Sequence, residues 1–355
     1  MKKIRRIIYA GLFAAALAGA QPNVTVYATG LNNPRGLKFG PDGFLYVAEG
    51  GTGGTTSTAG LCDQVVPPIG PYTGGGSDSR ISRIDSAGHR TTVVDGLPSS
   101  QTSALSGSFV SGVADLAFIG DTMYAILAGA GCSHGNPSLL PNGVLRVDRE
   151  SGTWSMIANL SAYQMANPVK NPEPDDFEPD GTWYSMIALR GSLYAIEPNH
   201  GEMVQITTTG AVSRVVDYSA IFGHIVPTAL AYHGNFYMGN LRTFPLVQGS
   251  SAVYKTNPSG NTKVDTPGFT SVLGLTFDNQ GRMYVLEMSP ATGFPQPFIG
   301  TVSRVDPSGA RTLLASGLAL PTGLTYGPDG ALYVSNFGFG FPAGAGQIWR
   351  IGLSD

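Results

Sequence analysis

The chain has 355 residues, of which 49 are glycine and only 13% are charged, and its formal net charge is −3. Glycine is about twice as frequent, and charge about half as frequent, as in an average globular protein. This composition is typical of many short strands joined by tight turns. The slightly acidic balance excludes the basic surface that nucleic acids or anionic lipids require.

The first 20 residues differ from the rest of the chain. Basic residues up to Arg6 precede an apolar run from Ile7 to Ala18, and Ala18-Gly19-Ala20 is a small-residue cleavage site. This pattern predicts a secretory signal peptide over 1–20, removed before Gln21. The apolar run is too short for a membrane span, which needs ~20 residues. We therefore expect a periplasmic or extracellular protein that is not embedded in a membrane. Its net charge is −3 − 4 = −7 once the four basic residues of the leader are lost.

One sequence unit recurs six times: an apolar strand, a tight turn, and a strand that carries a tyrosine. The turns contain Gly, Asn and Asp, which tolerate positive φ. We expect the tyrosines to pack between blades rather than to form a site. They are Tyr46, Tyr124, Tyr194, Tyr237, Tyr284 and Tyr333.

A second hairpin follows each unit, but the sixth lacks its fourth strand. The segment Val24-Thr25-Val26-Tyr27 precedes Gly30-Leu31 just as Leu313-Leu314-Ala315 precedes Gly317-Leu318, so the N-terminal strand can supply it. Such a clasp leaves no open sheet edge. The sequence predicts an all-β fold, a six-bladed β-propeller in a single domain over 21–355, whose last blade is completed by the N-terminal strand.

All the long insertions are expected on one face, which we call the loop face. It carries the connections between second and third strands and the links between blades, and long loops on a rigid scaffold often carry function. Cys62 and Cys132 fall in two such insertions, Gly50 to Ser79 and Gly129 to Asn142. In an oxidising compartment the two cysteines are expected to form one disulfide.

Oxygen-bearing side chains follow five of the six repeat tyrosines at a spacing of three residues. We call this set the ring: Glu49, Glu197, Asn240, Glu287 and Asn336. Carboxylate and amide oxygens suit Ca²⁺, so a metal ring is one hypothesis. The alternative is that each side chain hydrogen-bonds the turn beside it.

Two further patterns lie on the loop face. An acidic segment, interrupted by prolines, is either a cation site or a solvated loop: Glu173, Asp175, Asp176, Glu178 and Asp180. A set of phenylalanines predicts an aromatic mouth for a flat apolar ligand, unless the loops only pack on each other: Phe244, Phe294, Phe298, Phe337, Phe339 and Phe341. No nucleophile elbow, phosphate-binding loop or zinc-protease motif is present.

The segment from Tyr194 to Met203 resembles the repeats of NHL-type propellers. More closely, the chain from Val24 to Ile351 resembles the ScyD/ScyE family, named from the scytonemin pigment cluster. The landmarks are Pro227-Thr228-Ala229-Leu230, Thr243-Phe244-Pro245 and the run from Leu273 to Glu287. The chain departs from the family at Asp180-Gly181-Thr182-Trp183-Tyr184, where an Asn-Pro-Tyr-like element is expected. The resemblance implies an exported propeller linked in some members to late pigment maturation, and it supplies no catalytic residues.

Three functions are compatible with these observations. The first, which the phenylalanine-rich loops favour, is a protein that binds or helps mature an aromatic or apolar small molecule. The second is a Ca²⁺-dependent hydrolase of the gluconolactonase type, by analogy of the ring alone. The third is a protein-interaction scaffold.

Overall fold

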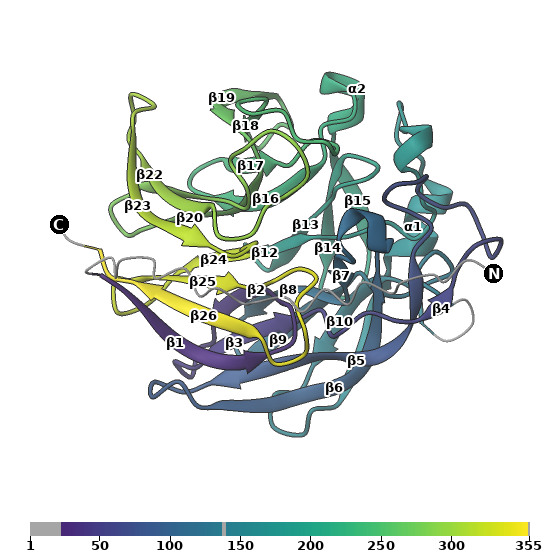
Figure 1. Cartoon of the computed structure of the whole chain (residues 1–355), viewed down its shortest axis with the longest axis horizontal. Coiled ribbons are helices and arrows are strands. Elements are labelled where there is room, and N and C mark those ends of the chain that lie inside the picture. The colour runs from purple at the N-terminus through teal and green to yellow at the C-terminus, as the bar shows by residue number, and fades with distance from the viewer. Residues whose placement is uncertain (1–22, 137–139, 354–355) are drawn as a thin grey trace, which may run out of the picture.

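In the computed structural model, residues 23–136 and 140–353 are described, and the predicted signal peptide lies outside them. These residues form six antiparallel sheets arranged as a six-bladed β-propeller, as the repeats predict (Figure 1). The innermost strands contact one another in turn, β2 with β8, β8 with β12, and so on through β16, β20 and β24 back to β2. The ring of blades is therefore closed.

Each blade runs outward from its innermost strand. The first comprises β2 (Pro34–Phe39), β3 (Leu45–Glu49), β5 (Thr73–Ile84) and β6 (Arg90–Gln101). The second comprises β8 (Val113–Ile119), β9 (Thr122–Leu127), β10 (Gly143–Val147) and β11 (Trp154–Asn159). The third comprises β12 (Ser185–Leu189), β13 (Ser192–Glu197), β14 (Glu202–Thr207) and β15 (Val212–Asp217).

The remaining blades follow the same order. The fourth comprises β16 (Pro227–Tyr232), β17 (Phe236–Asn240), β18 (Ser251–Thr256) and β19 (Thr262–Phe269). The fifth comprises β20 (Val272–Phe277), β21 (Met283–Glu287), β22 (Gly300–Val305) and β23 (Arg311–Leu318). The sixth comprises β24 (Gly323–Tyr326), β25 (Leu332–Asn336), β26 (Gly346–Ile351) and, outermost, β1 (Val24–Leu31).

The N-terminal strand closes the sixth blade, as predicted from the missing fourth strand. β1 pairs antiparallel with β26, with Val24 opposite Ile351 and Ala28 opposite Ile348. The two strands lie side by side in Figure 1. Leu31 is fully buried at the end of β1, so the clasp contributes to the core as well as to the hydrogen-bond ladder.

The core lies between blades, where the faces of neighbouring sheets meet. The repeat tyrosines are buried or partly buried there, which confirms their predicted packing role. In three blades the tyrosine hydroxyl also donates to the aspartate of its own hairpin turn, an interaction that the sequence analysis did not foresee. The pairs are Tyr46–Asp42 at 2.7 Å, Tyr284–Asp278 at 2.8 Å and Tyr333–Asp329 at 3.1 Å.

The first blade differs from the prediction. The segment Gly50 to Ser79 is not a simple loop, because β5 begins at Thr73 and the short strand β4 (Thr56–Ser57) pairs with it. β6 likewise runs on to Gln101, where β7 (Val110–Ser111) pairs with it. Several bulges interrupt the β5–β6 ladder, and Gly75 within it has a φ of +79°, which few other residues adopt. The outer hairpin of the first blade is therefore longer than that of the other five blades.

Two short α-helices also occur in the described blade links, beside 3-10 turns at Ala104–Ser106 and Pro174–Asp176. They are α1 (Leu160–Ala166) and α2 (Tyr218–Phe222), and the capping residues Asn159 and Asp217 each accept a hydrogen bond from a first-turn amide. Among the described residues, no helix has the length and apolar character needed to cross a membrane.

Candidate functional site

A cavity of about 520 Å³ opens on the loop face. Its walls come from connections of five blades: the first-blade insertion, the blade links, and the loops after β13, β17 and β25. A volume of this size is in the usual range for small-molecule sites. Its lining includes Arg35, Tyr72, Phe109, Asp176, Tyr184, Asn199, His224, Phe244 and Phe339.

Aromatic rings form one wall of the cavity. The ring of Phe109 lies 5.7 Å from that of Phe244 and 5.0 Å from that of Phe339, measured between centroids. Behind them is a small apolar cluster that includes Tyr184, Leu273 and Met288. These rings come from widely separated loops, and only the propeller brings them together.

The predicted phenylalanines divide into two groups. Phe244 and Phe339 line the cavity, and Phe341 packs on the same apolar cluster. Phe294 stacks on Phe244 at 6.1 Å but is 43% exposed, and Phe298 is 50% exposed beside Phe337. The sequence analysis missed Phe109, Tyr72 and Tyr184, because nothing in their local pattern separates them from core aromatics.

Arg35 lines the cavity near the start of β2 and is only 3% exposed. Its guanidinium carbon lies 4.7 Å from the ring centroid of Tyr184 and 4.3 Å from that of Phe339. Burial lowers its pKa, because the charged form loses hydration. An arginine nevertheless remains charged in a protein, so the cavity contains a fixed positive charge.

Acidic side chains also line the cavity. Asp176 accepts a hydrogen bond from Asn199 at 2.9 Å and lies 2.8 Å from Nε2 of His224. Burial raises the pKa of Asp176, and the contact with His224 opposes that shift. The side chains of His224 and Asp176 keep 10% and 19% of their surface exposed. This pair has the composition of a general acid–base dyad that solvent can reach.

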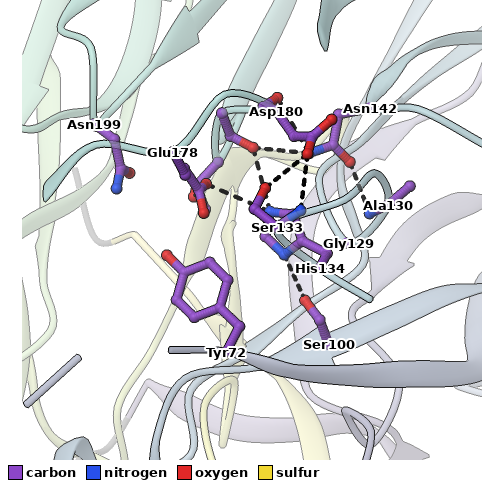
Figure 2. A network of polar contacts seen from close by, with 12 residues as sticks. Tyr72, Ser100, Gly129, Ala130, Ser133, His134, Asn142, Glu178, Asp180 and Asn199 are labelled. Carbon is purple, nitrogen blue, oxygen red and sulfur yellow. Dashed lines mark hydrogen bonds and ion pairs between the residues drawn. The ribbon is translucent and has the colours of Figure 1, made fainter. Parts of the chain in front are cut away.

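The other half of the acidic segment is buried and faces away from solvent. Glu178 and Asp180 join a polar network beneath the cavity rim (Figure 2). Asp180 accepts hydrogen bonds from the amide and the hydroxyl of Ser133, at 2.9 and 2.8 Å. Glu178 lies 3.4 Å from Nε2 of His134. The solvated-loop interpretation is therefore wrong for these two residues, because buried donors from the second blade hold them.

His134 is the centre of this network. Burial alone would lower its pKa, but the neighbouring carboxylates of Glu178 and Asp180 outweigh burial and raise it. On its other side Nδ1 lies 2.7 Å from the hydroxyl of Ser100, and its ring lies 4.9 Å from that of Tyr72. Ser100, His134 and Glu178 have the composition of a hydrolytic triad, but all three are completely buried. They tie strand β6 to the loop after β9 and to the link before β12 rather than meet a substrate.

The disulfide lies beside this network. Cys62 and Cys132 are bonded, with their Cα atoms 6.1 Å apart, which confirms the predicted pairing. The bond joins the first-blade insertion to the loop that carries Ser133 and His134. A disulfide is compatible with an exported protein.

The ring residues cap their own blades. Glu49 accepts from the amide of Asn32 at 2.6 Å, Glu197 from that of Thr182 at 2.7 Å, and Glu287 from that of Thr270 at 2.7 Å. Asn240 and Asn336 accept from the amides of Ala252 and Ala319, at 2.8 and 2.7 Å. Glu49 also pairs with Arg80 at 2.8 Å.

This arrangement does not fit a Ca²⁺ site made by the ring. Each ring side chain is hydrogen-bonded at a different blade, and among the described residues no group of three acidic, histidine or cysteine side chains is placed to hold a metal ion. The central channel is nearly filled, with room of about 20 Å³, roughly one water molecule. Asp115 lies in the channel and caps the amides of Leu116 and Met186. Burial raises its pKa.

Comparison with solved structures supports the fold. A gluconolactonase from Xanthomonas campestris superposes with a TM-score of 0.56 at 10% identity, over 93% of this chain and 89% of that one. A calcium-binding protein, regucalcin, from Agrobacterium tumefaciens superposes with a TM-score of 0.55 at 14% identity, over 92% of each chain. A putative oxidoreductase (glucose dehydrogenase) from Thermus thermophilus superposes with a TM-score of 0.54 at 16% identity, over 92% of this chain and 99% of that one.

At these identities the likeness shows the propeller fold alone. No protein-family model matches the sequence, and no curated protein matches it either. The comparisons therefore give no support to the resemblance to the ScyD/ScyE family, and the site must be interpreted from its own residues.

Proposed function

We propose that this propeller binds an aromatic or otherwise apolar small molecule in the cavity of the loop face. The observation that carries the proposal is the convergence of Phe109, Phe244 and Phe339 on one cavity of about 520 Å³. Exposing apolar side chains to water on loops is unfavourable. A flat ligand lying on these rings would remove their surface from water. The pigment-pathway role gains no support, so the ligand class rests on the cavity itself.

Binding of a fluorescent naphthalene probe tests this proposal. Replacing Phe244 or Phe339 by alanine should weaken binding by about 1–3 kcal/mol for each lost aromatic contact. Phe298→Ala is the matched control, since Phe298 is exposed and outside the cavity lining. Equal affinities in all three variants and the wild type would refute the site. If the wild type binds no aromatic probe at all, the interaction-scaffold function is favoured instead.

A second candidate is hydrolysis of a lactone or ester in the same cavity. Two observations favour it: the likeness to a gluconolactonase structure and the Asp176–His224 pair that opens on the cavity. His224, with Asp176 holding it, would take a proton from water as the water oxygen attacks the carbonyl carbon. The proton would then pass to the ring oxygen as the C–O bond breaks. This route uses no ion held by the ring residues.

The second candidate is tested by offering the protein a panel of aromatic and aliphatic lactones and measuring their hydrolysis with a pH-stat. Asp176→Asn and His224→Gln should each reduce the rate by roughly 10²–10⁴-fold. His89→Gln is the matched control, since His89 lies 3.1 Å from Asp85 in an exposed hairpin turn. A wild type that opens none of these lactones removes the hydrolase candidate and leaves the binding proposal in place.

A further inference from the structure

Neither aromatic packing nor the Asp176–His224 pair explains why a charged side chain, Arg35, is buried in the cavity wall. Its side chain is buried between the rings of Tyr184 and Phe339, and Nη1 donates to the carbonyl of Val110 at 3.2 Å. Its Nε is buried and has no hydrogen-bond partner. A buried donor left without a hydrogen-bond partner costs free energy.

No carboxylate in the described part of the chain pairs with this guanidinium. Among the described residues, the partly buried Arg80 and Arg214 each pair with a buried glutamate, at 2.8 and 2.7 Å, whereas Arg35 belongs to no ion pair. The adjacent Tyr184 supplies no negative charge, because burial raises its pKa to about 12 and its hydroxyl donates to the carbonyl of Thr322. Buried charges in proteins are normally paired. Within residues 23–136 and 140–353, Arg35 therefore has no charged partner.

We propose that the cavity takes a planar aromatic molecule that carries a carboxylate, and that Arg35 holds this carboxylate. The inference rests on the proposed binding function and specifies its ligand class. A guanidinium suits a carboxylate through charge-assisted, paired hydrogen bonds. The rings of Phe339 and Phe244 would then cover the aromatic part of the ligand.

The acidic side chains of the cavity limit the charge of the ligand. Glu173, Asp175 and Asp176 line the same cavity, so a ligand of higher negative charge would meet repulsion. A single carboxylate is therefore favoured over a phosphate. A hydrogen-bond donor elsewhere on the ligand would complement these carboxylates.

Three matched probes test the proposal by isothermal titration on the full exported chain: naphthalene-2-carboxylate, its neutral amide, and 2-naphthyl phosphate. The wild type should bind the carboxylate roughly 10- to 100-fold more tightly than the amide. It should also bind the carboxylate more tightly than the phosphate. Arg35→Met should abolish the preference for the carboxylate and leave affinity for the amide nearly unchanged.

Arg242→Met is the matched control, because Arg242 lines the same cavity but donates from Nε to the carbonyl of Ser250 at 3.2 Å. It should keep the carboxylate preference, and loss of the preference in this variant but not in Arg35→Met would overturn the assignment. If the wild type binds acid and amide equally, Arg35 is not an anchor and the cavity proposal survives. If it binds neither, both proposals fail. Should Arg35→Met not fold, the wild-type preference and the Arg242 variant still decide.

Discussion

Removing the disulfide is the perturbation whose magnitude follows most directly from the structure. Cys62 and Cys132 are 70 residues apart in sequence, so the bond closes a long loop of the unfolded chain. In the chain-entropy model, a loop of this length contributes about 4 kcal/mol at 25 °C. The unfolding entropy expected for a chain of this size is roughly 0.7 kcal/mol per degree. Dividing the lost free energy by this entropy predicts that Tm falls by about 6 °C.

The assay is thermal unfolding of the double variant Cys62→Ser with Cys132→Ser, followed by calorimetry. Reduced wild type should melt at the same lower temperature, and the reducing agent should leave the variant unchanged. The first-blade insertion, which carries Tyr72 into the cavity, should also become more sensitive to protease. A variant that melts within a degree of the wild type, with the same protease pattern, would refute the reasoning.

Three further predictions follow. Deleting 24–31 should expose the edge of β26 and make the protein aggregate, as size-exclusion chromatography would detect, and a monomer with unchanged Tm would contradict the clasp. His134 faces Glu178, Asp180, Tyr72 and Ser100, and its raised pKa means that its contribution to stability is complete below about pH 6.5 and is lost as pH rises through the raised value. Urea unfolding should show this loss, and Glu178→Gln should flatten it. Chelation should leave Tm unchanged in the wild type and in Glu287→Gln, and a chelator-induced drop that Glu287→Gln abolishes would restore the metal ring.

Much of the architecture could be predicted from the sequence because it depends on local pattern. Each hairpin has its own turn chemistry, and each strand its own alternation, so the six blades repeat visibly along the chain. Closure by the N-terminal strand could be predicted because the sixth repeat has only three strands of its own. The disulfide could be predicted because both cysteines belong to insertions on the same face of adjacent blades.

Individual site residues were less predictable. Phe244 and Phe339 belong to a pattern that the sequence displays, whereas Phe298 belongs to the same pattern and lies outside the cavity. The ring residues recur at a fixed spacing, but fixed spacing reflects a repeated cap as readily as a shared ligand. Only the hydrogen-bond partners distinguish the two.

The sequence by itself determined the propeller, its closure by the N-terminal strand and the face on which the loops gather. The tertiary structure decided which residues meet above the channel. Arg35 lies between Tyr184 and Phe339, and Asp176 pairs with His224, across separations that no local pattern encodes. The physical reason is that strands follow short-range backbone preferences, whereas the path of a long loop depends on which distant side chains can satisfy its buried polar groups.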